Sequence, residues 1–265
     1  MASSDATFAG SIPSIYDRHM GPLYFQPYAA EVARRVAGWQ PDRLLETAAG
    51  TGIVTAAIAH ASPGTRITAT DLNPDMLSVA KRRLSSAPNV RTQMADMQSL
   101  PFEDGSFDAV VCQFGIMFVP DKVRAHAEAR RVLAPGGRYL LVIWDRLEKN
   151  PVAQCVHDTI SGMFPDDPPQ FVGRTPFGYG DPAAIEHDLM AAGFTDIEFE
   201  TVALDSSPDA TAEDASLGLV EGSPLRAELE ARGDGWLEKA EAAVRKALTA
   251  NFSRALSAHV VTARR

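Results

Sequence analysis

Residues 44–52 have the sequence LLETAAGTG, and this stretch decides the fold class of the chain. A short apolar run (residues 43–47) ends in a turn of small residues, and the apolar pattern of a helix begins at Ile53. Small side chains let the backbone approach a ligand closely, and the N-terminus of the following helix offers N–H groups to anionic atoms. A strand, a small-residue turn and a helix in this order are typical of the first unit of a nucleotide-binding α/β sheet.

Strands and helices alternate along the chain around this turn. Apolar residues recur at helical spacing from Tyr28, and Pro41 ends that helix. Near-continuous apolar runs that alternate with helices indicate a mostly parallel sheet with helices on both faces, so the fold class is α/β. The predicted strands of this part are 43–47, 66–71, 90–94, 107–114 and 138–144, and the helices between them are 53–60, 74–85 and 121–133.

Two stretches interrupt the alternation and divide the single predicted domain, residues 1–265. Residues 1–27 hold three prolines, so we expect an irregular N-terminal arm in place of continuous helix. Residues 145–181, rich in proline, glycine and aromatic residues, are predicted to form a lid or insertion after the fifth strand. Residues 28–144 form the predicted core. Residues 182–265 complete the sheet with a helix to 192, a strand at 197–204, an amphipathic helix at 236–252 and a last strand at 258–263.

Composition and charge exclude several classes of protein. The chain has 265 residues, of which 45% are hydrophobic, so it can bury one core and is not predominantly disordered. Its formal net charge of −9 disfavours nucleic acid as a partner. Two cysteines, Cys112 and Cys155, cannot form a disulfide framework, and metal-ligand spacing is absent. We expect a soluble, cytoplasmic protein, because neither a signal peptide nor an apolar run of spanning length occurs.

A second acidic residue follows the next predicted strand. The run RITATD (66–71) ends in Asp71, and 71 − 52 = 19 residues separate it from Gly52. This is close to the roughly 20 residues expected for an acid that binds ribose hydroxyls. The alternative is that Asp71 caps the helix beginning near Pro74, although Asn73 is better placed for that cap.

Four blocks in a fixed order carry a resemblance to a known family: LLETAAGTG (44–52), TDLNPDML (70–77), ADMQSLPFEDGSFDAVVCQFGIMFV (95–119) and RVLAPGGRYLLV (131–142). Over roughly residues 28–144 the chain resembles the class I S-adenosylmethionine-dependent methyltransferases, in the type 11 branch similar to ubiquinone/menaquinone C-methyltransferases. The resemblance implies a Rossmann-like, doubly wound sheet of seven mostly parallel strands with an antiparallel last strand. It also implies S-adenosylmethionine as cofactor and S-adenosylhomocysteine as product.

The resemblance implies roles for particular residues. The family's acid-x-Gly-x-Gly-x-Gly loop matches Glu46, Ala48, Gly50 and Gly52, with Ala48 in place of the usual first glycine. Core packing is the alternative for Leu72, Met76 and Met97, and turn stabilisation is the alternative for Asp96. The implied contacts are Asp71 with the ribose, Leu72 and Met76 with the adenine, Asp96 with its amino group, Met97 with its face, and Gln113 and Phe114 with the methionine part.

The methyl acceptor is expected to be a small organic molecule with some apolar surface. The sequence QFGIMF (113–118) follows the fourth strand, where methyltransferases acting on nucleic-acid amines or protein amides commonly carry Asn/Asp-Pro-Pro-Tyr/Phe. Aromatic residues of the arm and the insertion are the candidate acceptor contacts, although they could instead only pack against the end of the sheet. These candidates are Tyr16, Tyr24, Phe25, Phe177 and Tyr179.

Candidate catalytic groups are few, because in-line methyl transfer needs a general base only where the acceptor must lose a proton. His19 and His157 are the histidines to test, with a surface or structural role as the alternative for each. Arg174 could contact an anionic acceptor or could be a solvated loop residue. The sequence therefore leaves the catalytic residues unknown.

Two other functions compete with methyl transfer. A non-catalytic module could bind S-adenosylmethionine with the same residues and form no product. A nicotinamide-dependent oxidoreductase uses the same type of crevice, but position 55 is Thr where its Gly-x-Gly-x-x-Gly fingerprint requires glycine. Methyl transfer to a small molecule is the function that the sequence predicts; the acceptor and the oligomeric state are not determined by it.

Overall fold

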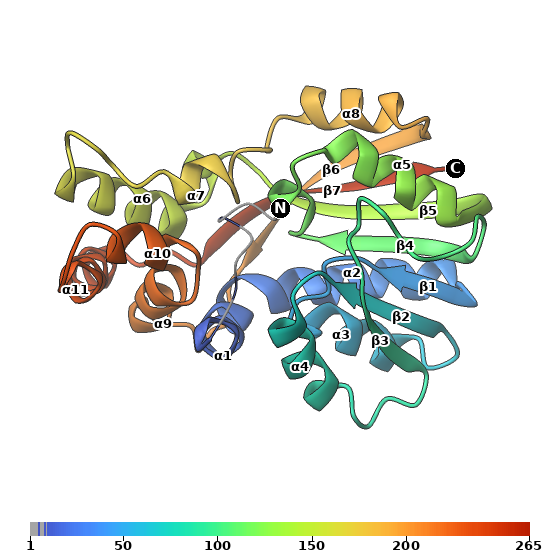
Figure 1. Ribbon diagram of the computed structural model, residues 1–265, viewed down its shortest axis with the longest axis horizontal. Helices are drawn as coiled ribbons and strands as arrows, with labels where there is room; N and C mark the ends of the chain where they lie inside the picture. The colour runs from blue at the N-terminus through green and yellow to red at the C-terminus, as the bar shows by residue number, and fades with distance from the viewer. Residues whose placement is uncertain (1–4, 6–7, 9) are drawn as a thin grey trace.

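The main feature of the computed structural model, which describes residues 5, 8 and 10–265, is a seven-stranded sheet of order β3-β2-β1-β4-β5-β7-β6 (Figure 1). β7 is antiparallel to both its neighbours, and the other pairs are parallel. The predicted α/β fold with an antiparallel last strand is confirmed. The strands are β1 (Arg43–Glu46), β2 (Arg66–Asp71), β3 (Val90–Met94), β4 (Phe107–Gln113), β5 (Leu133–Trp144), β6 (Thr195–Asp205) and β7 (Ala255–Arg264).

Helices cover both faces of the sheet. From β1 the chain proceeds through β2 to β3 at one edge, and it then returns to β4 on the other side of β1 and continues to β5. Because both sets of connections have the same hand, their helices lie on opposite faces. α2 packs against α3, and α5 packs against α8 (Figure 1). Within the described part of the chain, no helix is long and apolar enough to cross a membrane. The helices of these two layers are α2 (Gln26–Trp39), α3 (Ile53–Ala61), α4 (Pro74–Arg83), α5 (Lys122–Val132) and α8 (Pro182–Ala191).

A group of mostly short helices lies at one end of the sheet, on the left of Figure 1. α11 contacts α6 and α9, and the N-terminal segment η2 contacts η5, so segments far apart in the sequence form one layer there. Its members are α1 (Ile12–Ile15), η2 (Tyr16–Phe25), α6 (Pro151–Met163), α7 (Phe171–Arg174), α9 (Ala212–Ser216), η5 (Leu217–Glu221), α10 (Leu225–Glu230) and α11 (Trp236–Ala250); the one-turn segments η3 (Ile116–Phe118) and η4 (Leu147–Lys149) follow β4 and β5.

The prediction of an irregular arm is wrong over residues 12–27, because these residues are helical and continue into α2. Pro13 and Pro27 lie in the first turns of α1 and α2, where a missing N–H leaves no helical bond unmade. Pro22 lies within η2, a π-helical segment in which Gln26 N–H bonds to the carbonyl five residues earlier. Residues 1–4, 6, 7 and 9 of the predicted arm lie outside the described residues.

Residues 145–181 do interrupt the alternation of strands and helices, but they are more regular than predicted. They contain the 13-residue helix α6 and the short helix α7. Residues 206–235, for which the sequence predicted no element, contain α9, η5 and α10. These segments have five or six residues each, so they are too short to display a helical repeat of apolar residues.

Candidate functional site

The loop after β1 has the backbone conformation that small residues permit. Ala48, Gly50 and Gly52 have φ angles of 53°, 55° and 79°, a region that glycine enters readily and other residues rarely adopt. The methyl group of Ala48 fits because Gly115, just beyond β4, lies against it. A side chain on Gly115 would overlap the Cβ of Ala48. The loop therefore accommodates alanine at this position through a glycine from another part of the chain.

Asp71, the last residue of β2, holds this loop. Its Oδ2 accepts the backbone N–H of Gly50 at 2.8 Å, and its Oδ1 accepts that of Asn73 at 2.8 Å. Burial raises the pKa of Asp71, and the two backbone N–H groups oppose that shift. Asn73 caps α4 as predicted, because its side chain accepts the N–H groups of Asp75 and Met76. Carboxylate oxygens accept more than one hydrogen bond, so Asp71 retains capacity for a ligand hydroxyl.

A long cleft extends along the carboxyl ends of β1, β2 and β4. All the predicted cofactor residues except Glu46 and Gly52 line it, together with neighbours that the sequence did not single out. A Cβ built on Gly50 would meet no described atom within 4 Å, so the loop leaves open space there. The lining residues are Phe8, Tyr16, Ala48, Gly50, Asp71, Leu72, Asn73, Pro74, Met76, Ala95, Asp96, Met97, Gln98, Gln113, Phe114, Gly115, Phe118, Val119 and Pro120.

The residues that line the cleft differ in their burial and in the hydrogen bonds that they make with the rest of the protein. Leu72 is 48% exposed, so core packing does not explain it, whereas Met76 and Met97 are buried and belong to both the core and the cleft wall. Asp96 does stabilise a turn, since its Oδ1 accepts the N–H of Gln98 at 2.8 Å. Gln113 donates its Nε2 to the carbonyl of Phe25, while its Oε1 is buried without a partner in the described structure.

Glu46, the last residue of β1, and Gly52, the N-cap of α3, flank the loop and are not among the residues that line the cleft. Glu46 is 1% exposed, and its Oε2 accepts the hydroxyl of Thr55 in α3 at 2.6 Å. A Cβ on Gly52 would come within 3.1 Å of Ala80 and Leu84, so this glycine permits close packing of α3 against α4. Both residues therefore contribute to the packing around the loop and do not line the cleft. Burial is the main reason why the pKa of Glu46 is raised to about 8.

The raised pKa of Glu46 predicts a pH-dependent stability. Between the ordinary pKa of 4.5 and about 8, the unfolded chain loses this proton and the folded chain keeps it, so stability falls as pH rises. Glu46→Gln should therefore match the wild type near pH 5 and exceed its unfolding free energy by roughly 3 to 5 kcal/mol near pH 8. Thermal unfolding from pH 5 to 8 measures this, with Glu148→Gln at the surface as the charge control. Parallel profiles for wild type and Glu46→Gln would contradict the assignment.

A second cavity adjoins the cleft and is lined almost entirely by apolar side chains. Its walls come from η2, from the ends of β4 and β5, from the segment around α7 and from η5. Phe114 and Trp144 stack face to face with their ring centroids 3.7 Å apart. The lining residues are Phe8, Tyr16, Met20, Tyr24, Phe25, Phe114, Phe118, Trp144, Phe171, Val172, Pro176, Phe177, Leu219 and Ser223. We call this the aromatic cavity.

The aromatic cavity and the cleft share Phe8, Tyr16, Phe114 and Phe118. The ring of Phe8 packs edge-on against Tyr16 and Phe118, with centroids 5.7 and 5.8 Å apart. Its carbonyl accepts the side-chain N–H of Asn73, the residue that caps α4. Among the described residues, these shared side chains form part of the wall between the aromatic cavity and the cleft.

Four of the five predicted acceptor residues line the aromatic cavity. Tyr16, Tyr24, Phe25 and Phe177 line the aromatic cavity, while Tyr179 is not among the residues that line either space. The hydroxyl of Tyr179 donates to Asp188 of α8 at 2.8 Å, which holds this ring against the layer of α5 and α8.

Neither candidate histidine is among the residues that line the cleft or the aromatic cavity. The Nδ1 of His19 lies 2.8 Å from Asp214, so this side chain joins η2 to α9. His157 lies on α6 near Gly173, with its Nδ1 buried and without a partner among the described atoms. The structure gives no geometric support for either residue as a base.

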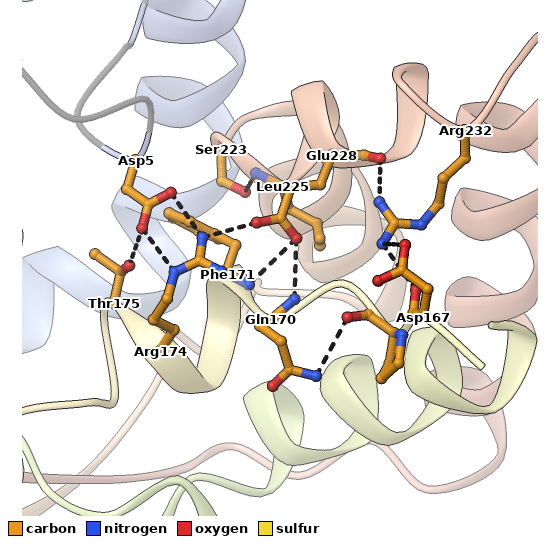
Figure 2. Close-up of polar contacts among 11 residues, drawn as sticks. Asp5, Asp167, Gln170, Phe171, Arg174, Thr175, Ser223, Leu225, Glu228 and Arg232 are labelled. Carbon is orange, nitrogen blue, oxygen red and sulfur yellow. Dashed lines mark hydrogen bonds and ion pairs between the residues drawn. The ribbon is translucent and has the colours of Figure 1, made fainter. Parts of the chain in front are cut away.

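Arg174 is held by internal contacts instead of facing an acceptor. Figure 2 shows its guanidinium between Asp5 and Glu228: Nε and Nη2 donate to Asp5 at 3.0 and 2.8 Å, and Nη2 donates to Glu228 at 2.7 Å. Glu228 also accepts the backbone N–H groups of Gln170 and Phe171. This cluster joins the N-terminal segment, α7 and α10 beside the aromatic cavity, whose wall includes Phe171.

Comparisons with known proteins agree with this geometry. Residues 45–141 match a family model described as a methyltransferase domain. The chain is 40% identical over 132 residues to the ubiquinone/menaquinone biosynthesis C-methyltransferase of Methylobacterium nodulans, covering 49% of this chain and 52% of that protein. It is 31% identical over 184 residues to the demethylmenaquinone methyltransferase of Chlorobaculum parvum, covering 66% and 71%.

The similarity to solved structures extends over nearly the whole chain. Phosphoethanolamine N-methyltransferase 2 of Haemonchus contortus, in complex with S-adenosyl-L-methionine, superposes with a TM-score of 0.62 at 19% identity, covering 95% of this chain and 56% of that one. At this low identity, the superposition establishes a shared fold alone. The chain spans about half the length of several curated relatives that it matches.

Proposed function

Since this chain belongs to the class I S-adenosylmethionine-dependent methyltransferases, in the branch that includes ubiquinone/menaquinone C-methyltransferase relatives, we propose that it methylates an uncharged, ring-containing small molecule. The cofactor binds in the cleft beside Asp71, and the acceptor binds in the aromatic cavity. The observation that carries this proposal is the wall that the two spaces share, which is formed by Phe8, Tyr16, Phe114 and Phe118.

The residues of the cleft fit this cofactor. The open space at Gly50 allows a ligand to lie against bare backbone. Asp71 and Asp96 provide carboxylates for hydroxyl and amino groups, and Leu72 and Met97 provide apolar contacts for a flat ring. Gln113 lines the cleft at the end of β4, where the methionine part of the cofactor would lie beside it. We propose these roles for the residues that match the motifs of the family.

The chemistry required of the chain is mainly positioning. The bound cofactor supplies a methyl group already activated on a sulfonium sulfur. The chain holds the acceptor at this carbon and excludes water, and alignment of two reactants alone removes several kcal/mol from a barrier. Among the described residues that line the aromatic cavity there is no carboxylate, imidazole or amine. Burial raises the pKa of Tyr16 and Tyr24, so these phenols remain protonated.

The proposal is tested by binding and by product formation. Calorimetry measures S-adenosylmethionine binding, and a radiolabelled methyl group is followed into solvent-extractable products from a panel of hydroxylated benzenes and naphthalenes. Binding with transfer to a member of the panel supports the enzyme. Binding with no transfer to any of them supports a non-catalytic binding module instead.

Phe177→Ala should weaken acceptor binding without weakening cofactor binding. Phe177 lines the aromatic cavity, stacks at 5.8 Å from Trp144, and is absent from the described lining of the cleft. Removing this ring should raise the acceptor KM about 10-fold, a typical cost for an aromatic contact. Tyr179→Phe is the control, because its ring lines neither space. An unchanged KM in Phe177→Ala, or an equal rise in both variants, would contradict the placement of the acceptor.

A further inference from the structure

One arginine joins two segments that form walls of the cleft and of the aromatic cavity. Arg83, the last residue of α4, donates its Nε to the backbone carbonyl of Thr51 at 3.1 Å. Its Nη2 donates to the carboxylate of Asp17 in η2 at 2.5 Å. Thr51 belongs to the loop after β1, and Asp17 directly follows Tyr16, which lines both spaces. A single guanidinium therefore connects the loop to η2.

The loop after β1 is held at two successive points, and Arg83 provides the second of them. The backbone N–H of Gly50 donates to Asp71, which lines the cleft. The carbonyl of the next residue, Thr51, accepts Arg83, which is not among the described residues that line the cleft or the aromatic cavity. Glycine has more conformational freedom than any other residue, so a loop with glycine on both sides of Thr51 gains a defined conformation from such contacts. A preformed loop binds a ligand more tightly, because less freedom is lost on binding.

The ion pair between Arg83 and Asp17 is partly shielded from solvent. Their side chains are 27% and 24% exposed, so salt screens this charge-assisted contact less than one at the open surface. A planar guanidinium also fixes the directions of its two acceptors, which a flexible ammonium cannot do. Beside this contact η2 packs closely on the start of α3, where a Cβ on Gly21 would lie 3.3 Å from the Cδ1 of Ile53. The contact can therefore hold η2 in a defined position relative to the loop.

We propose that Arg83 is a positioning residue for methyl transfer, which holds the loop after β1 and η2 in one arrangement so that the cofactor binds to a preformed site. This inference rests on the proposed placement of the cofactor in the cleft. Arg83 acts there through the carbonyl of Thr51. Asp17 holds the guanidinium in place, so its effect on cofactor binding depends on Arg83. Cofactor affinity should thus respond to two residues that are absent from the described lining of both spaces.

A double-mutant cycle, measured by titration calorimetry with S-adenosylhomocysteine, tests this role. Arg83→Met should weaken binding about 10-fold, a cost at the lower end for a lost hydrogen bond of a charged group. Asp17→Asn should weaken it about 3-fold, and the double variant again about 10-fold, because Asp17 acts only through Arg83. Arg83→Lys should still lose about 3- to 10-fold, since one ammonium cannot replace the planar fork. The control is Arg82→Met, the same charge change at an exposed site of the same turn, which should bind within about 2-fold of the wild type.

Hydrogen exchange separates positioning from a purely structural role. In the wild type, saturating S-adenosylhomocysteine should slow amide exchange in the loop and also in residues 18–23 of η2, which are not among the described residues that line the cleft. In Arg83→Met at saturation, the loop should still be protected and residues 18–23 should not. A residue that only stabilised the fold would change Tm and leave both the affinity and this ligand-dependent protection as they are in the wild type.

The outcomes that would overturn the inference are distinct from those that would overturn the proposed function. Equal affinities of wild type and folded Arg83→Met, or additive losses of about 30-fold in the double variant, would contradict only the role of Arg83. Asp17→Asn keeps the shape of its side chain and provides the same comparison should Arg83→Met not fold, since an unchanged affinity in this variant also contradicts that role. Absence of S-adenosylhomocysteine binding by the wild type would contradict the proposed function and this inference together.

Discussion

Replacing Gly50 with valine should abolish the binding of S-adenosylmethionine while the protein remains folded. A Cβ at this position points into open space in the cleft, where the cofactor is proposed to lie against the backbone. A branched side chain would fill that space. It would also strain the loop, because φ is 55° at Gly50 and β-branched residues rarely adopt positive φ. Titration calorimetry of the folded variant should therefore detect no binding.

Gly136→Val separates the steric effect from the backbone effect. Gly136 also has positive φ (75°), and a Cβ there would also meet nothing within 4 Å, but it lies in the first part of β5 and is not among the cleft residues. Both variants should lose similar stability, and only Gly50→Val should lose the cofactor. Normal binding by Gly50→Val would mean that the cofactor binds elsewhere.

Asp71→Ala should weaken S-adenosylmethionine binding by about 10- to 150-fold, the cost of one charge-assisted hydrogen bond of roughly 1.5 to 3 kcal/mol. The variant also loses the bonds to the N–H groups of Gly50 and Asn73, so its Tm should fall as well. Asp75→Ala, with the same charge change at an exposed site in the first turn of α4, is the control. Equal affinities for the two variants, measured by calorimetry on folded protein, would remove Asp71 from the site.

The sheet could be predicted from sequence because its central strands are buried on both faces. The run FDAVVCQ of β4 is almost continuously apolar, and small or turn-forming residues mark the boundaries of the neighbouring elements. The N-terminal helices could not be predicted by the same reasoning. Proline usually ends an α-helix, and nothing in the local sequence indicates the π-helical bonding around Pro22.

The cleft was more predictable than the aromatic cavity for a similar reason. Asp71 and Gln113 are the last residues of β2 and β4, and the carboxyl ends of parallel strands meet at one edge of the sheet. The aromatic cavity combines η2 with Val172 and Leu219, which are far apart in sequence and come together only through packing of short helices. Glu46 illustrates the limit of motif matching, since it is the last residue of β1 and its buried side chain is not among the residues that line the cleft.

A crystal structure of the protein with S-adenosylhomocysteine tests the proposed function most directly. We expect the ribose hydroxyls to lie within hydrogen-bonding distance of Asp71, with adenine near Leu72 and Met97. We also expect the sulfur to face the shared wall at Phe114, toward the aromatic cavity. A ligand bound outside the cleft, or one whose sulfur faces away from the aromatic cavity, would contradict the proposal that these two spaces hold the methyl donor and its acceptor.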